Sequence, residues 1–400
     1  MNNIYHSGSL AAMKTVLAMG LVILAGCAQT GQTTAPAAHK APAAHKETGL
    51  AALADGWNEF KPGGETICTD GSEYKFFVRP GARNDLLFYL QGGGACWSRE
   101  HCDPDLEPTM TINTEGLDPS SYGGIFDFQN TENPFKDYTV VFVPYCSGDS
   151  HLGAQDTVYD SLAEDGEPLT IYHRGFANAG SALDWTYQNL ASPARIFVTG
   201  SSAGSIPSPY YADKLADLYT SATVVQLGDA SGGYRRVPGS TRPEAMWGSL
   251  EYLIDQTGWE DVDAETFNFE QIYIRASLKH PEIMFSSYDT AEDQVQKNFL
   301  DLIGGQDTSN LQVLIDKNQQ DIRRSVKNFR SYVIGGDLHT VLLRAEFYTY
   351  TLDNHSVRDW VTALSNGAEV HDVHCGECFV QAPAAGKAPA AGSEAPAALE

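Results

Sequence analysis

Residues 195–204 read RIFVTGSSAG, and this stretch decides the fold class of the chain. A run rich in β-branched and aromatic residues enters Gly200-Ser201-Ser202-Ala203-Gly204, which matches the pattern G-x-S-x-G, and a helical pattern at 206–219 follows. In such a strand-to-helix turn the serine oxygen is exposed, and the glycines keep Cβ atoms out of a crowded bend. The stretch predicts Ser202 as a nucleophile, with the N–H of Ala203 directed at a developing oxyanion.

Strands and helices alternate on both sides of this stretch. Apolar runs bounded by turn residues predict strands at 86–90, 139–143, 223–227, 283–287 and 332–334. Helical patterns occupy 174–190 and 356–365, and Ser356 is the expected N-cap of the second. Alternation of this kind predicts an α/β fold, a mostly parallel sheet with helices on both faces.

A glycine-rich turn, Gly92-Gly93-Gly94-Ala95, follows the strand at 86–90. Turns of this kind after an early strand supply a second oxyanion donor in hydrolases with a G-x-S-x-G turn. The general base should be a late histidine at a strand end, and His339 follows the strand at 332–334 in that way. The other late histidines lack this placement and are expected to be structural: His355, His371 and His374.

A nucleophilic serine and its histidine base need an acid as the third member of a catalytic triad, and this acid should lie between Ser202 and His339, also at a strand end. Asp289 comes two residues after the predicted strand at 283–287, and Asp293 is the reserve candidate four residues further on. Asp229 ends the strand at 223–227, but the nucleophile helix directly precedes that strand. We therefore expect Asp229 to shape the site rather than to orient the histidine.

The N-terminus has the pattern of an export signal. Lys14 precedes an apolar run, 15–25, which is too short to span a bilayer, and Met13 is an alternative start to Met1. Leu24-Ala25-Gly26-Cys27 resembles a bacterial lipobox, which predicts a lipidated Cys27; an ordinary signal peptide or a short buried helix is the alternative. Since no Asp follows Cys27, we expect an exported lipoprotein of the outer membrane, or otherwise a periplasmic or secreted protein, that meets the membrane only through its lipid.

Composition divides the chain into a signal segment (1–27), an Ala/Pro linker (28–49), one catalytic domain (50–380) and an Ala/Pro-rich tail (381–400). The linker and the tail lack the large apolar residues needed for a core and are expected to be disordered. The net charge of −25, from 26 basic and 51 acidic residues, argues against nucleic acid as a partner.

Six of the seven cysteines remain when Cys27 is set aside. In an exported protein an even number favours three disulfides, although 15 pairings are possible. The segment 371–378, HDVHCGEC, also has the spacing of a metal site built from its histidines and cysteines. The export signal favours a Cys375–Cys378 disulfide over that alternative.

Several separated blocks resemble the pectin acetylesterase and Notum family in the same order. They are CTDGS (68–72), LLFYLQGGGACWSREHC (86–102), NPFKDYTVVFVPYCSGD (133–149), TGSSAG (199–204), SYD (287–289) and the pair Asp359-Trp360. The resemblance implies an α/β-hydrolase that removes acyl groups from oxygen without cofactor or metal. It assigns Ser202, Asp289 and His339 as the triad, Gly93, Gly94 and Ala203 as oxyanion donors, and Cys68–Cys146 as a disulfide. We further expect a Cys96–Cys102 disulfide, because it closes a short loop beside the glycine turn and would hold that turn in place.

The sequence departs from the family near the site. Gly94 and Ala95 stand where Notum has a large aromatic residue, and Gly336, Asp337 and Thr340 stand near the base where plant members carry cysteines. These departures leave the acyl and polymer specificity open.

We expect short acyl esters, acetate above all, on a carbohydrate such as pectin or a neutral acetylated glycan. The global charge opposes pectin, unless a basic patch that includes Arg174, Arg235 and Arg236 lies near the site. The alternatives are a lipid or protein-lipid deacylase, and a non-catalytic surface binding protein on a hydrolase fold.

Overall fold

The computed structural model describes residues 49–376 and 378, except for 164, 238, 258, 260, 264 and 306. The predictions for the export signal with Cys27, for the Ala/Pro linker up to residue 48 and for the tail concern residues outside this part. None of the helices in the described part combines the length and the apolar character that a membrane crossing requires.

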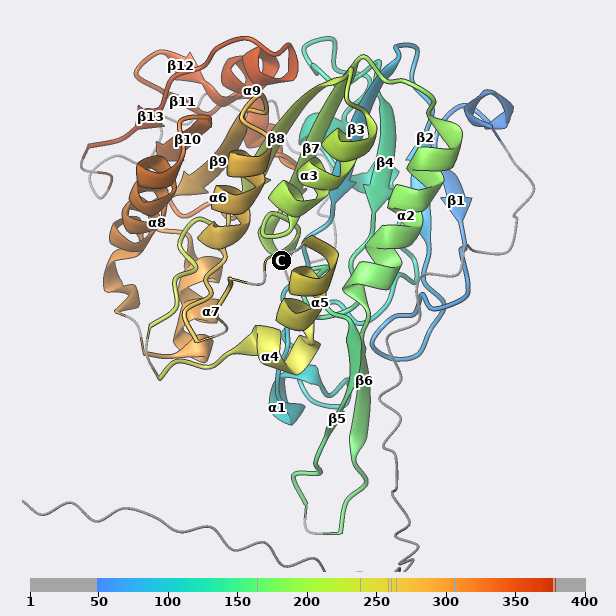
Figure 1. Cartoon of the computed structure of the whole chain (residues 1–400), viewed down its shortest axis with the longest axis vertical. Coiled ribbons are helices and arrows are strands. Elements are labelled where there is room, and N and C mark those ends of the chain that lie inside the picture. The colour runs from blue at the N-terminus through green and yellow to red at the C-terminus, as the bar shows by residue number, and fades with distance from the viewer. Residues whose placement is uncertain are drawn as a thin grey trace, which may run out of the picture. The chain divides into compact units, whose positions relative to one another are not determined.

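Within the described residues, nine strands form one sheet in the order β1-β2-β4-β3-β7-β8-β9-β10-β13 (Figure 1). Neighbours are parallel from β4 to β13, whereas β2 is antiparallel to β1 and to β4. The strands are β1 (Asn58–Phe60), β2 (Phe76–Arg79), β3 (Asp85–Leu90), β4 (Thr139–Val143), β7 (Arg195–Ser201), β8 (Thr223–Asp229), β9 (Phe285–Thr290), β10 (Phe329–Ile334) and β13 (Val373–His374). The predicted α/β class is confirmed, and the arrangement is α/β-hydrolase-like.

Helices cover both faces of the sheet, as predicted. One face packs against α2 (Gly175–Asn189), α3 (Ser208–Leu218), α6 (Glu270–Lys279) and α8 (Leu311–Ser325), and the other packs against α9 (Val357–Ser365) (Figure 1). Ser356 is the N-cap of α9, because its hydroxyl accepts the N–H of Asp359 at 3.0 Å.

Further helices, turns and hairpins complete the described part of the chain. The helices are α1 (Arg99–Cys102), α4 (Pro243–Trp247), α5 (Ser249–Thr257) and α7 (Gln294–Ile303). The 3₁₀ turns are η1 (Leu50–Ala52), η2 (Pro119–Ser121), η3 (Gly124–Phe126), η4 (Ser202–Gly204), η5 (Thr308–Asn310) and η6 (Ala345–Tyr348). Two hairpins pair β5 (Gln155–Tyr159) with β6 (Leu169–His173), and β11 (Thr351–Leu352) with β12 (His355–Ser356).

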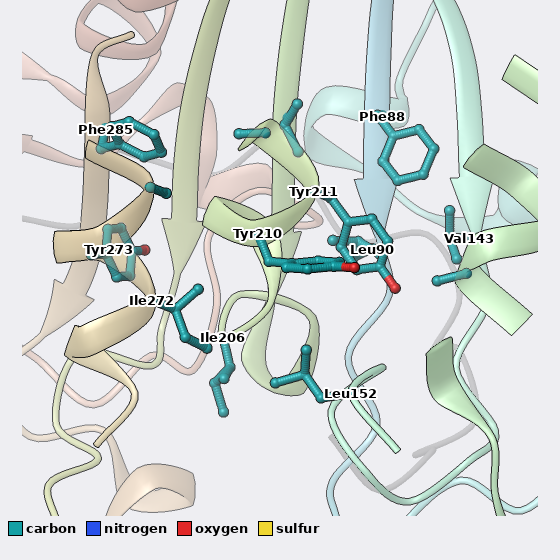
Figure 2. Close-up of a cluster of buried hydrophobic side chains, with 14 of the residues drawn as sticks. Phe88, Leu90, Val143, Leu152, Ile206, Tyr210, Tyr211, Ile272, Tyr273 and Phe285 are labelled. Atoms are coloured by element: carbon teal, nitrogen blue, oxygen red, sulfur yellow. The ribbon is translucent and has the colours of Figure 1, made fainter. Parts of the chain in front are cut away.

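The core has two layers because successive side chains of a strand point to opposite faces of the sheet. On β3, Phe88 and Leu90 join the layer below α3, whereas Leu87 and Tyr89 join the layer below α9. Figure 2 shows the first layer, in which Tyr211 of α3 lies over Phe88 with the ring centroids 5.9 Å apart. Burial of one such side chain stabilises the fold by about 1.5–3 kcal/mol. The two layers fix the sheet, and with it the carboxyl ends of β3, β7, β8, β9 and β10, where the candidate site lies.

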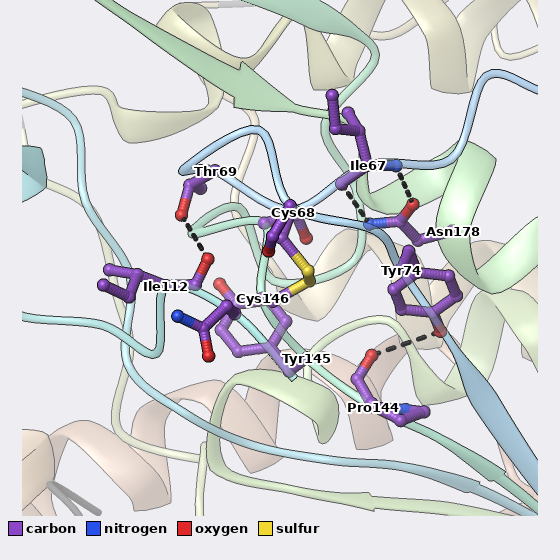
Figure 3. Close-up of a disulfide and its surroundings, with 12 residues drawn as sticks. Ile67, Cys68, Thr69, Tyr74, Ile112, Pro144, Tyr145, Cys146 and Asn178 are labelled. Atoms are coloured by element: carbon purple, nitrogen blue, oxygen red, sulfur yellow. Dashed lines mark hydrogen bonds between the residues drawn. A yellow bond between two sulfur atoms is a disulfide. The ribbon is translucent and has the colours of Figure 1, made fainter. Parts of the chain in front are cut away.

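The six cysteines of the domain pair as predicted: Cys68–Cys146, Cys96–Cys102 and Cys375–Cys378. Cys68–Cys146 joins the segment before β2 to the segment after β4 (Figure 3). Asn178 of α2 holds the adjacent backbone of Ile67 with two hydrogen bonds of 3.0 and 2.9 Å. Hydrogen bonds from α2 therefore hold the backbone next to this disulfide.

Candidate active site

The turn that carries Ser202 joins β7 to α3, as the sequence predicts. Ser202 has a φ of 52°, in the left-handed region that residues with a Cβ seldom adopt, and it is 7% exposed. Close backbone contacts require the two glycines of this turn. A Cβ on Gly200 would lie 2.2 Å from the carbonyl oxygen of Gly204, and one on Gly204 would lie 2.2 Å from that of Leu90. Only glycines let β3 approach the turn this closely.

The glycine turn after β3 lies directly against the serine. A Cβ on Gly92 would come within 2.9 Å of the Cβ of Ser202. Gly94 has a φ of 78° and forms an isolated antiparallel bridge with Met110, which fixes the turn from its other side. None of the hydrogen bonds within the described part of the chain uses the N–H of Gly93, Gly94 or Ala203. These three predicted donors are therefore available to an oxyanion.

Polar contacts with the loop after β4 hold the glycine turn in place. The side-chain oxygen of Gln91 accepts the N–H of Tyr145 at 3.1 Å, and the backbone carbonyl of Gln91 contacts Nε2 of His151 at 2.8 Å. Burial lowers the pKa of His151 to about 4, so the ring is neutral at pH 7 and donates from Nε2 to this carbonyl. The turn is thus positioned by uncharged groups.

His339 lies in the loop after β10, and its partner is Asp293. Nδ1 of His339 donates to Oδ2 of Asp293 at 2.7 Å, and both side chains are buried. Asp293 is also the N-cap of α7, because its Oδ1 accepts the N–H groups of Val295 and Gln296 at 2.9 and 3.1 Å. An ionised carboxylate only accepts hydrogen bonds, so the neutral imidazole carries its proton on Nδ1. Nε2 of His339 is buried without a partner among the described residues and can accept a proton.

The structure pairs His339 with the reserve candidate Asp293 and not with Asp289, the predicted acid. The strand β9 extends to Thr290, three residues beyond the predicted end, and Asp289 pairs with Val333 inside the sheet. Its Oδ1 accepts the N–H of Gly232 at 2.7 Å, and no hydrogen bond joins it to His339 within the described residues. Burial above all, together with the neighbouring charge of Asp293, raises the pKa of Asp289 to about 8. The reserve candidate Asp293 therefore contacts the histidine, while Asp289 stays protonated at pH 7.

A pocket of about 400 Å³, counting its open mouth, lies at Ser202. Its lining consists of Gly94, Ala95, Trp97, Ser150, Ser202, Ala203, Ile206, Tyr234, Pro243, Trp247, Phe269, Phe299 and Ile303. The lining is apolar or aromatic except for a few hydroxyl groups, as in sites that bind apolar ligand groups. The sequence did not reveal Trp97, Trp247, Phe269 or Phe299 as site residues, because they come from separate segments and share no local pattern.

The arginines proposed for a basic patch are paired with acidic residues. Arg174 contacts Asp156 and Glu65, each with an oxygen within 2.7 Å. Arg235 and Arg236 line a second pocket, which shares Tyr234, Pro243, Phe269 and Ile303 with the pocket at Ser202. Arg235 contacts Asp321 at 2.7 Å, and Arg236 contacts Glu244 at 3.4 Å. Acidic partners thus offset the charge of these arginines.

The alternative of a metal site at 371–378 loses its two thiolates to the Cys375–Cys378 disulfide. His374 contacts Asp316 at 2.8 Å, and the backbone carbonyl of His371 accepts the indole N–H of Trp360. These residues have structural contacts at the edge of the sheet.

The strand order, the turn at Ser202 and the His339–Asp293 pair define a protein of the α/β-hydrolase type. Comparison with known proteins narrows the class. The sequence model of the pectinacetylesterase family matches residues 61–260, and the chain belongs to this family.

Parts of the chain are similar to proteins named palmitoleoyl-protein carboxylesterase and to one named pectin acetylesterase. Palmitoleoyl-protein carboxylesterase notum1' of Xenopus laevis is 29% identical over 162 residues, 38% of this chain and 30% of that protein. Pectin acetylesterase 4 of Arabidopsis thaliana is 27% identical over 174 residues, 42% of this chain and 41% of that protein. Inactive palmitoleoyl-protein carboxylesterase notum1b of Danio rerio is 35% identical over 92 residues, 22% of this chain and 66% of that protein. The chain thus matches less than half the length of the first two relatives.

Proposed function

We propose that this protein is a serine carboxylesterase that hydrolyses oxygen esters, with Ser202 as nucleophile, His339 as base and Asp293 as acid. The observation that carries the proposal is the hydrogen bond from Nδ1 of His339 to buried Asp293, which leaves Nε2 able to accept a proton. The unused N–H groups of the glycine turn and of Ala203 beside Ser202 support it.

The chemistry follows from these groups. Oγ of Ser202 attacks the ester carbonyl carbon while Nε2 of His339 takes the hydroxyl proton. The N–H groups of Gly93, Gly94 and Ala203 stabilise the oxyanion. Protonated His339 then gives its proton to the leaving alcohol, and the ionised Asp293 stabilises the imidazolium. Water, activated by His339, hydrolyses the acyl-enzyme and releases the acid.

As substrate we propose a short acyl ester, acetate above all, on a carbohydrate. The family and the name of the Arabidopsis relative support acetyl groups. A net charge of −25, with the candidate arginines ion-paired, favours a neutral acetylated glycan over pectin. Acetate release from both polymers at low and moderate salt tests this. Pectin activity should rise with salt, and strong pectin activity that falls with salt would contradict it.

A lipid or protein-lipid deacylase is the second candidate. The apolar pocket at Ser202, walled by Trp97, Trp247 and Phe269, could hold an acyl chain longer than acetyl. The palmitoleoyl-protein carboxylesterase name of the Xenopus relative supports this candidate. p-Nitrophenyl esters of two to sixteen carbons separate the two: highest kcat/KM for acetate supports the first, and for octanoate or longer the second.

One relative, notum1b of Danio rerio, is named as inactive, so the nucleophile of this protein should be tested directly by labelling. A fluorophosphonate probe should label the wild-type protein and Ser205→Ala but not Ser202→Ala. Ser205 is a matched control because it is buried three residues further on, and its Oγ contacts that of Ser231. Wild-type protein that neither labels nor hydrolyses any ester would favour a non-catalytic binding protein.

We further propose that the protein is exported and anchored through lipid on Cys27. The lipobox-like residues 24–27 and the linker repeats support this, and the three disulfides suit an oxidising compartment.

A further inference from the structure

A third buried carboxylate, that of Asp229, lies between the two turns of the proposed active site. Asp229 is the last residue of β8, pairs with Ser201 of β7 in the parallel register, and is fully buried. Neither the pocket at Ser202 nor the His339–Asp293 pair includes it. A buried charge is costly unless hydrogen bonds satisfy it, so its contacts need an explanation.

The contacts of Asp229 join two segments far apart in the sequence. Oδ2 accepts the hydroxyl of Ser201 at 2.9 Å, so the carboxylate contacts the residue directly before Ser202. The N–H of Val341 lies 3.0 Å from both carboxylate oxygens, and that of Leu342 lies 3.0 Å from Oδ2. One carboxylate thus connects the nucleophile turn with the loop that carries His339.

Strained backbone surrounds this carboxylate. Ser202, Ala230 and Thr340 have φ values of 52°, 67° and 58°, in the left-handed region that side chains disfavour. Each is the direct neighbour of a residue in the network, namely Ser201, Asp229 or Val341. Such conformations persist only where the surroundings hold them, and they concentrate at functional sites.

The charge state of Asp229 suits a group that accepts several hydrogen bonds. Burial raises its pKa to about 6, while its hydrogen bonds and the charge of His339 act in the opposite direction. Above this pH the carboxylate is ionised and only accepts, as its three donor residues require. The titratable groups that interact electrostatically with Asp229 are Tyr89 of β3, Tyr288 and Asp289 of β9, and His339 of the loop after β10.

We propose that Asp229 is a positioning residue, which holds the Ser202 turn and the His339 loop at the separation that proton transfer requires. This inference rests on the proposed esterase activity. Asp229 acts through Ser201 on one side and through Val341 and Leu342 on the other, and it touches neither the substrate nor the reacting atoms. Loss of this connection should slow catalysis without weakening substrate binding.

Asp229→Asn tests the proposal. The asparagine keeps one acceptor oxygen but presents an amide N–H₂ to backbone N–H donors or to the Ser201 hydroxyl, so the connection loosens. A displacement of about 1 Å in an active site costs about 100-fold in rate. With p-nitrophenyl acetate we expect kcat to fall about 100-fold, and KM to change by no more than about threefold. The rate of fluorophosphonate labelling should fall with kcat.

Ser201→Ala is the second variant, and it breaks only the contact with the nucleophile turn. Its kcat should fall several-fold, and the double variant should be no slower than Asp229→Asn, because both changes disrupt one connection. If Asp229→Asn fails to fold, Ser201→Ala decides alone: unchanged kcat would overturn the proposal.

Asp85→Asn is the matched control for the loss of a buried carboxylate. Asp85 lies at the opposite, amino end of β3, is buried, and pairs with Arg83 at 2.6 Å. It should lower Tm but leave kcat unchanged below its Tm. Equal kcat in Asp229→Asn and Asp85→Asn, with wild-type protein active, would refute the positioning role alone. Wild-type protein inert to esters and to the probe would refute the esterase proposal, and this inference with it.

Discussion

Asp293→Asn should abolish turnover because it reverses the proton on His339. Oδ1 of Asp293 caps α7 through the N–H groups of Val295 and Gln296, and Oδ2 accepts from Nδ1 of His339 at 2.7 Å. An asparagine that keeps the cap must present its N–H₂ group to the histidine. Nδ1 must then become the acceptor, so the neutral ring carries its proton on Nε2 and cannot accept the proton of Ser202.

The expected loss is about 10⁴-fold in kcat, which corresponds to about 5 kcal/mol of transition-state stabilisation. The free energy of unfolding should change little, because asparagine caps a helix about as well as aspartate. Asp293→Ala should lose both functions, with a further cost of about 1 kcal/mol in stability from the missing cap. Steady-state kinetics on p-nitrophenyl acetate and urea unfolding measure the two effects separately.

Asp289→Asn is the matched control, four residues away and equally buried. Since Asp289 is already uncharged at pH 7, its kcat should stay within about threefold of wild type. An active Asp293→Asn beside an inactive Asp289→Asn would refute this reasoning and assign the acid to Asp289.

Three further changes test stability and location. Because the pKa of Asp289 is raised to about 8, the folded wild type retains a proton that the unfolded chain loses, so its free energy of unfolding should fall between about pH 4 and pH 8. Urea unfolding of wild type and Asp289→Asn at pH 5, 7 and 9 measures this: the stability of the variant relative to wild type should rise up to about pH 8 and no further. Replacing Cys68 and Cys146 by serine, which opens a loop with a sequence separation of 78, should lower the free energy of unfolding by about 4 kcal/mol, against about 2 kcal/mol for the short Cys375–Cys378 loop. Cys27→Ser should move the protein from the membrane fraction to the soluble fraction with unchanged kcat, and unchanged fractionation would argue against the lipid anchor.

Features set by a few neighbouring residues were predictable. The turn at Ser202 follows from glycines at 200 and 204 between an apolar strand and a helix, and the structure places it there. The strand end before His339 and the N-cap Ser356 were likewise predictable from the local sequence. Family resemblance supplied the Cys68–Cys146 pairing, whereas the short loops and the export signal indicated the Cys96–Cys102 and Cys375–Cys378 pairings.

The carboxylate that contacts His339 could not be predicted from the local sequence. The sequence offered Asp289 and Asp293 as the two candidates, but the predicted strand ended three residues before the end of β9. The sheet extends through Asp289 because this residue pairs with Val333 of β10, a contact between strands that the pattern of either strand does not specify. A one- to three-residue error in a strand end changes which carboxylate reaches the histidine.

By itself, the sequence determined the α/β class, the serine turn, the position of the histidine and the six paired cysteines, because each depends on periodicity, on turn chemistry or on family blocks. Only the tertiary structure decided that Asp293 contacts His339, that Trp97, Trp247 and Phe269 wall the pocket, and that Asp229 joins the two turns. These contacts join residues distant in the chain, and they form only when the packed sheet brings the carboxyl ends of its strands together.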